Sequence, residues 1–184
     1  MAVGNDANIM EKEISRERVF NGIILNIDHA VNELPNGKPA KREIAVHVGA
    51  SAVVPVDEDN NVYMVRQFRC PLETVLLEIP AGKLEYRGAD FRDAAIRELE
   101  EETGYTAKEW IPLGVFYPAC AYSDETIWMY LAKGLELGER NPDEDEFLDV
   151  IKIPLEKAVE MVLKNEIVDA KSQTAILKTY LLKN

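Results

Sequence analysis

Residues 81–88 read AGKLEYRG, and residues 90–105 read DFRDAAIRELEEETGY. In the second stretch the apolar residues recur with the period of a helix that has one buried face. Asp90 is a good N-cap residue, and Gly104 is typical of the position at which a helix ends. We therefore expect a helix that begins at Asp90 and ends near Gly104.

This helix carries a cluster of carboxylates near its end. Glu98 stands three residues before Glu101 and four before Glu102, so the three side chains lie on neighbouring turns and repel one another. A solvated acidic face is the simpler interpretation of such a run when nothing else is known. The alternative is a cation site, because carboxylates with a nearby backbone carbonyl suit Mg2+ or Mn2+.

Extended segments surround this helix. The first dozen residues are polar and are expected to be loose, and the extended pattern starts at Glu17. An Asn36-Gly37 turn then joins two strand-like runs. Further helices are expected after Pro154 and over about residues 170–182. Strands with helices between and after them favour a single α/β domain with a mixed sheet packed between helices. The expected extended runs are 23–29, 42–48, 51–56, 62–68, 75–79, 110–116, 126–132 and 147–153.

The charge of the chain limits its partners. Lys and Arg number 21 against 33 Asp and Glu, which gives a net charge of −12. This charge repels nucleic acid, and no basic stripe with interleaved aromatic residues opposes it, so we expect no nucleic-acid partner. An anionic small substrate would bind only where metal ions and a few arginines reverse the local sign.

The remaining composition indicates a cytoplasmic protein. A chain of 184 residues fits one domain, and no apolar run is long enough to span a membrane. The first residues lack the layout of a signal peptide. Cys70 and Cys120 are read as reduced thiols, and His29 and His47, which lack metal-ligand spacing, are read as structural.

With these elements in place, the segment from Gly82 to Tyr105 resembles the Nudix box, G-x5-E-x7-R-E-U-x-E-E-x-G-U, where U is apolar. Two features depart from it: the loop is one residue longer, and Ala89 occupies the position of the first Glu. We expect Asp90, beside it, to take over the structural role of that Glu as the helix cap. The matching residues are Gly82, Arg97, Glu98, Leu99, Glu101, Glu102, Gly104 and Tyr105.

Outside the box, further pieces of the sequence are informative: Arg42-Glu43, Arg66-Gln67-Phe68-Arg69, Leu77-Glu78-Ile79-Pro80-Ala81-Gly82, Tyr117-Pro118, Ser123-Asp124-Glu125 and Asp143-Glu144-Asp145-Glu146. In these pieces the chain resembles the ADP-ribose pyrophosphatase branch of the Nudix hydrolase family. This resemblance implies a Nudix-like mixed β-sheet sandwiched between helices, with an N-terminal antiparallel strand region. Residues 1–45 would form a strand and dimerisation region and residues 46–184 the hydrolase domain, within one structural unit and a homodimer.

The same resemblance implies cleavage of ADP-ribose to AMP and ribose 5-phosphate with two to three Mg2+ or Mn2+ ions. Arg97 would brace the carboxylates, and Glu144 or Glu146 would deprotonate or orient the attacking water. Metal ligands would be the Ala81 carbonyl, Glu98, Glu101, Glu102 and Glu146. Substrate contacts would come from Arg42, Arg66, Arg69, Glu78, Pro118 and Glu125.

Two alternatives remain beside this function. Ala119-Cys120-Ala121-Tyr122 departs from the branch in the loop expected to face the terminal sugar, so a different nucleotide sugar such as GDP-mannose, or a broad range, is the nearest rival. In this branch an aromatic residue of the partner subunit's N-terminal region often stacks on the adenine. Phe20 is the single aromatic residue in the corresponding stretch of this chain. A non-catalytic nucleotide-sugar sensor is the second alternative, but the complete late-box carboxylates and the lack of a DNA-binding module argue against it.

Overall fold

The computed structural model describes residues 6–141 and 147–183, and the chain divides into two compact units. The first unit is Met1–His47 with Ala119–Glu125, and the second is Val48–Pro118 with Thr126–Asn184. Each unit is considered by itself below. The expected dimerisation role of residues 1–45 stays a prediction.

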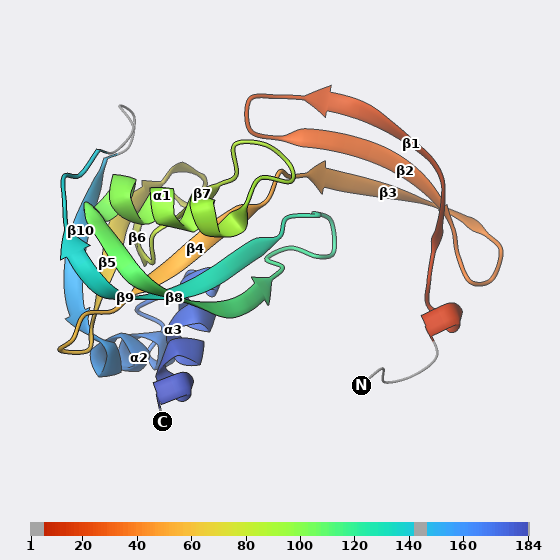
Figure 1. Ribbon diagram of the computed structural model, residues 1–184. Helices are drawn as coiled ribbons and strands as arrows, with labels where there is room; N and C mark the ends of the chain where they lie inside the picture. Colours follow the sequence, from red (N-terminus) through yellow and green to blue (C-terminus); the bar gives the residue numbers. More distant parts are fainter. Residues whose placement is uncertain (1–5, 142–146, 184) are drawn as a thin grey trace. The chain divides into compact units, whose positions relative to one another are not determined.

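The first unit contains a three-stranded antiparallel sheet in the order β1 (Lys12–Asn21), β2 (Asn26–Glu33) and β3 (Pro39–Val46) (Figure 1). A short 3-10 helix, η1, covers Asp6–Asn8 ahead of it. The expected Asn-Gly turn joins β2 to β3. Gly37 takes a left-handed φ of 79° there, a conformation that glycine adopts without steric cost.

The beginning of the chain is more regular than the sequence suggested. Extended structure was expected from Glu17, but β1 already begins at Lys12. Glu11, just before it, accepts a hydrogen bond of 3.1 Å from the Arg42 Nε on β3. Residues 12–16 read KEISR, which has no alternation of apolar and polar residues, and they are extended because they pair with β2. The missing local pattern explains the error.

The β1–β2 turn also differs from expectation, because the predicted extended run over 23–29 begins too early. The Gly22 N–H donates to the Leu25 carbonyl at 2.8 Å, so the chain turns there and β2 starts at Asn26. Ile23 and Ile24 lie in this turn and are exposed. Apolar residues at a turn were therefore mistaken for a strand.

The second unit is built on a four-stranded mixed sheet, as expected. Strands β4 and β9 run parallel, whereas the other neighbouring pairs are antiparallel. Such a mixture fits a sheet whose two faces are both covered. The strand order is β7 (Ala81–Lys83), β4 (Ala50–Pro55), β9 (Ile127–Leu137) and β8 (Tyr105–Phe116).

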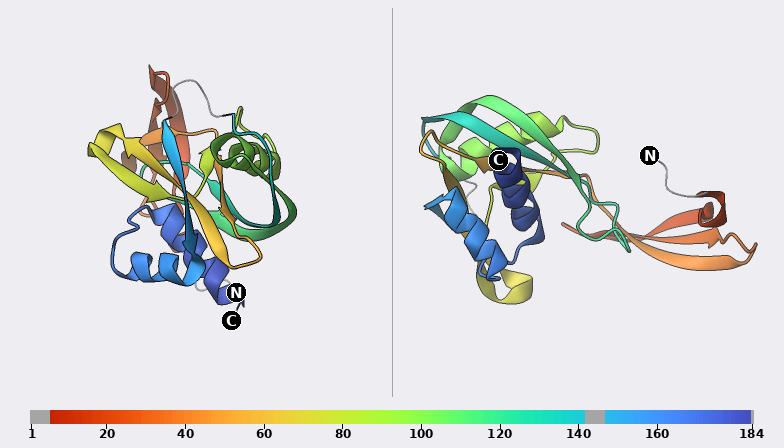
Figure 2. Two further views of the ribbon diagram at one scale, coloured as in Figure 1. Left: turned by 90° about the vertical axis from the view of Figure 1, so that its left-hand side faces the viewer. Right: turned by 90° about the horizontal axis from the view of Figure 1, so that it is seen from below.

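Strand β4 explains how this sheet is covered, because all its residues are buried. Ala52 and Val54 belong to the main core cluster, together with residues of α2 (Leu155–Leu163) and α3 (Ala170–Lys183). Val53 points the other way and packs with Leu99 of α1 (Phe91–Thr103). Helix α1 and the α2–α3 pair therefore cover opposite faces, as Figures 1 and 2 show, and the predicted fold class is confirmed.

A second sheet in the same unit is antiparallel and positions two candidate site residues, Arg69 at the end of β5 (Asn61–Arg69) and Glu78 at the end of β6 (Thr74–Glu78). Among the described residues, no helix is long and apolar enough to cross a membrane. The helices predicted after Pro154 and over about residues 170–182 are both present, as α2 and α3. The sheet order is β10 (Leu148–Pro154), β5 (Asn61–Arg69) and β6 (Thr74–Glu78), and the helices are η2 (Cys70–Leu72), α1 (Phe91–Thr103), α2 (Leu155–Leu163) and α3 (Ala170–Lys183).

Candidate active site

Helix α1 carries the carboxylate cluster and has defined ends. At its start the Asp90 side chain accepts hydrogen bonds from the backbone N–H groups of Arg92 and Asp93, at 2.8 and 3.1 Å. At its end Gly104 takes a left-handed φ of 76°, which lets the chain leave the helix without strain. The expectation that Asp90 caps the helix beside Ala89 is thus confirmed.

Arg97 braces two of the carboxylates. Its Nη2 lies 2.7 Å from Glu98 Oε1, and its Nη1 lies 2.7 Å from Glu101 Oε2. Nη2 also donates to the Lys83 carbonyl at 3.1 Å, which ties the helix to the last residue of β7. Burial works to lower the pKa of Arg97, but the charges of Glu98 and Glu101 outweigh it and the pKa is raised.

Glu98 and Glu102 are both buried, whereas Glu101 is partly exposed. Two buried carboxylates one helical turn apart repel each other, and a cation bound between them would stabilise both. This observation argues against the solvated acidic face. Roles of the individual carboxylates as metal ligands stay predictions.

The backbone beside the cluster fits a metal site. A Cβ added at Gly82 would overlap the Glu98 carboxylate, so this carboxylate lies directly against the backbone that follows Ala81. Carboxylates next to a backbone carbonyl form the oxygen-rich donor set that a hard divalent cation takes. Within residues 6–141 and 147–183, no three His, Cys, Asp or Glu side chains are already arranged as a metal site.

Arg69 and Glu78, both predicted substrate contacts, are bound to each other. Arg69 Nε and Nη2 donate to the two Glu78 carboxylate oxygens at 2.6 and 2.8 Å. Burial works to raise the pKa of Glu78, but the hydrogen bonds from Arg69 and the charge of Lys171 outweigh it and the pKa is lowered. The pKa of Arg69 is raised by its bonds to Glu78, with a smaller contribution from Glu102, which relates this pair to the carboxylate cluster.

Lys171 is a functional candidate that the sequence analysis missed. Its Nζ binds Glu78 Oε2 and lies 3.1 Å from Asp169 Oδ2. Asp169 also accepts from the Ser172 backbone N–H at 2.9 Å, as an N-cap residue does. The cap pattern was visible in the sequence as an Asp before an apolar helix. The contact with Glu78 was not, because the two residues are 93 positions apart.

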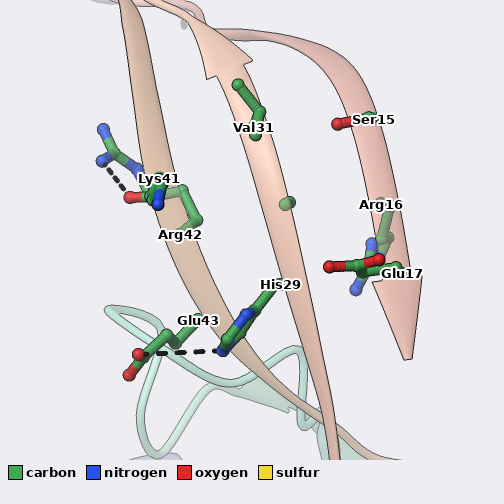
Figure 3. A pocket seen from close by; sticks show the side chains of 9 residues that line it. Ser15, Arg16, Glu17, His29, Val31, Lys41, Arg42 and Glu43 are labelled. Atoms are coloured by element: carbon green, nitrogen blue, oxygen red, sulfur yellow. Dashed lines mark hydrogen bonds and ion pairs between the residues drawn. The ribbon is translucent and has the colours of Figure 1, made fainter. Parts of the chain in front are cut away.

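Two further predicted residues lie in the first unit. Arg42 lines a hollow of about 460 Å³ over the three-stranded sheet, in which His29 and Glu43 face each other from neighbouring strands (Figure 3). Arg42 itself is bound to Glu11. Glu125 Oε1 lies 3.9 Å from His47 Nδ1.

The remaining predicted residues are spread over the second unit or fall outside the described residues. Arg66 is exposed and lies 3.5 Å from Asp149, on the face of β5 opposite to Arg69. Pro118 is exposed just after β8. Glu144 and Glu146 lie outside the described residues, so the base that was predicted there stays a prediction.

Comparison with known proteins places these features in a family. The NUDIX domain family model matches residues 45–174. The chain is 45% identical to an ADP-ribose pyrophosphatase of Bacillus subtilis (strain 168), with 92% of each chain covered. It is 44% identical to a methanol dehydrogenase activator of Bacillus methanolicus, with 90% of each covered. A crystal structure of an ADP compounds hydrolase is similar in fold, with a TM-score of 0.81, 21% identity, and 94% and 93% of the two chains covered.

Proposed function

The chain belongs to the Nudix hydrolase family, as the box predicted, and from this we propose that it cleaves the diphosphate linkage of ADP-ribose to AMP and ribose 5-phosphate. The observation that carries this proposal is the burial of Glu98 and Glu102 on α1, with the Glu98 carboxylate against the Gly82 backbone. The 45% identity with a named ADP-ribose pyrophosphatase supports the choice of substrate.

Nudix hydrolases generally use divalent metal ions, and we propose Mg2+ or Mn2+ here, two to three ions in number. The Ala81 carbonyl, Glu98, Glu101, Glu102 and Glu146 would hold them. When bound, the metal supplies charge neutralisation at the diphosphate and lowers the pKa of bound water.

The side chains of this protein have separate tasks in the proposed reaction. Arg97 keeps Glu98 and Glu101 in place, because its two amino groups bind one carboxylate each. Arg69 presents a guanidinium to the phosphates, with Arg42, Arg66, Glu78, Pro118 and Glu125 as the other proposed substrate contacts. Glu144 or Glu146 orients or deprotonates the water. Separate Gln variants should therefore show one large loss of turnover, and two mild effects would move the base elsewhere.

We also propose a homodimer in the cytoplasm, in which the N-terminal strands contribute to the neighbouring subunit's site. Exposed apolar residues at the β1–β2 turn support an interface on the first unit. The cytoplasm suits Cys70 and Cys120, which are free and exposed thiols.

A substrate panel tests the proposal. Purified protein is assayed with Mg2+ on ADP-ribose, GDP-mannose, UDP-glucose and NADH, and the substrates are ranked by kcat/KM. ADP-ribose should rank first, with AMP and ribose 5-phosphate as products, and EDTA should abolish turnover until Mg2+ or Mn2+ is added in excess. A higher rank for GDP-mannose would support the rival substrate suggested by the altered loop at Ala119–Tyr122. Metal-independent cleavage would contradict the mechanism.

A second candidate function is activation of a methanol dehydrogenase, supported by the 44% identity with an activator of that name. The test is methanol oxidation by such a dehydrogenase, measured with and without this protein. Stimulation by the wild type but not by Glu102→Gln would show that activation needs the same site. No stimulation at stoichiometric protein would exclude this candidate.

A further inference from the structure

Four charged side chains of the second unit, from the ends of β5 and β6 and the start of α3, form one network. Glu78, at the end of β6, accepts two hydrogen bonds from Arg69 and one from Lys171. Lys171 in turn lies 3.1 Å from Asp169, which precedes α3. The network holds two cations and two anions, so it is neutral as a whole.

Its members differ in their access to solvent. The Glu78 side chain is 2% exposed and Lys171 is 13% exposed, whereas Arg69 is 38% exposed. An anionic ligand in solvent therefore reaches Arg69 before it reaches the other members. Moving Arg69 toward such a ligand withdraws a cation from a buried carboxylate, which is strongly unfavourable if no other cation stays behind.

We propose that Lys171 is a positioning residue that keeps Glu78 charge-compensated, so that Arg69 can turn from Glu78 to a phosphate group of the substrate. Lys171 acts through Glu78 and Arg69 and needs no contact with the substrate. The part that concerns the substrate rests on the proposed function. The compensation of Glu78 by Lys171 does not.

The first turn of α3 holds Lys171 where this role requires it. Asp169 binds both the Lys171 ammonium and the Ser172 hydroxyl, the latter at 2.5 Å. The Ser172 Oγ accepts from the Ile79 backbone N–H at 2.8 Å. This hydrogen bond fixes α3 to Ile79, the residue that follows Glu78. The segment between Glu78 and Ala81 is therefore anchored to the first turn of α3.

The compensation is tested by 13C NMR titration of the Glu78 carboxyl, which needs no turnover. In Arg69→Met, Lys171 remains as the partner, so the pKa of Glu78 should stay below its ordinary value. In the double variant Arg69→Met with Lys171→Met, neither cation remains beside Glu78, so burial and the neighbouring Asp169 carboxylate should raise the pKa above that value. A pKa above the ordinary value in Arg69→Met itself would overturn the proposal. Arg69→Gln replaces Arg69→Met if circular dichroism shows that the latter is unfolded.

Kinetics on ADP-ribose test the consequence. Lys171→Met should raise KM by about tenfold or more, because Arg69 stays bound to Glu78, while kcat changes less. Lys171→Arg should restore KM, and Lys157→Met, which removes an exposed lysine of α2, should leave it unchanged. In the Arg69→Met background, adding Lys171→Met should have little further effect on KM, because the two residues act in series.

The outcomes separate the two proposals. A wild type that cleaves ADP-ribose, with an unchanged KM in Lys171→Met, overturns the role of Lys171 alone. Independent, multiplicative effects of the two variants also overturn it, because they would indicate that Lys171 contacts the substrate directly. A wild type that does not cleave ADP-ribose contradicts the proposed function, and the Glu78 titration then still decides whether Lys171 provides the compensation.

Discussion

Glu102 is buried at 2% exposure on the face of α1 that carries the candidate metal ligands. Glu102→Gln keeps the size and shape of the side chain but removes its charge. We expect kcat with ADP-ribose to fall by about a hundredfold or more, ~2.7 kcal/mol in transition-state stabilisation. Steady-state assays at saturating Mg2+ measure this.

Glu100→Gln is the matched control, because Glu100 lies on the same helix but is exposed. It should keep turnover close to that of the wild type. Circular dichroism should show both variants folded. A Glu102→Gln enzyme with near-normal kcat would remove Glu102 from the proposed metal shell.

Gly82 is the second residue at which a small change has a defined consequence. The Cβ of Gly82→Ala would occupy the space of the Glu98 carboxylate, so either the carboxylate or the backbone after Ala81 must move. We expect a loss of kcat and a weaker dependence on added Mg2+ as the metal site is distorted. Titration of activity against Mg2+ concentration measures both effects.

Gly138→Ala is the control for this variant, because a Cβ there would meet its nearest neighbour at 3.4 Å, an ordinary contact. Its metal dependence should match that of the wild type. If Gly82→Ala shows the same Mg2+ titration as Gly138→Ala, the Glu98 carboxylate has room to move and Gly82 is not part of the site.

At the scale of the elements, the ends of α1 were predicted correctly because their signals are local. Asp90 and Gly104 each act within a few residues of their own position. Asp90→Ala should lower the free energy of unfolding by about 1 kcal/mol, since two backbone N–H groups lose their acceptor. Urea unfolding measures this, and Asp90→Asn, which keeps a capping oxygen, should recover most of the loss.

Turnover provides a further check on this variant. Glu98 lies more than two turns beyond Asp90, so we expect folded Asp90→Ala to keep most of its kcat. A stability unchanged within error would mean that the cap contributes nothing. A large loss of kcat in the folded protein would instead give Asp90 a direct role at the position where the box has its first Glu.

Contacts between distant elements could not be read from the sequence in the same way. The box predicted Glu98, Glu101, Arg97 and their helix, because their relation is one of spacing along that helix. The contact of Lys171 with Glu78 joins α3 to β6 across 93 positions. Nothing in the local pattern of either segment requires the other. The early start of β1 was missed for the same reason, since its first residues are extended through their pairing with β2, where Lys12 lies opposite Glu33.

At the scale of the whole molecule, the first unit has an unusual surface. Every residue of β1 is exposed, and the turn that follows it presents Ile23 and Ile24 to solvent. Single exposed apolar residues need no explanation, but a contiguous group at one edge marks an interaction surface. The proposed homodimer would cover this surface with a second copy of the chain.

Ile24→Glu tests this arrangement by placing a charge in the proposed interface. Light scattering coupled to size exclusion should give twice the chain mass of 20.7 kDa for the wild type and a shift toward the single-chain mass for the variant. Leu163→Glu, at an exposed apolar position on α2, should remain dimeric. If the N-terminal strands complete the neighbouring site, kcat/KM of Ile24→Glu should fall with the dimer fraction and recover at higher protein concentration. A wild type that is monomeric at all concentrations, or a monomeric variant with full activity, would contradict the proposed contribution of one subunit to the other's site.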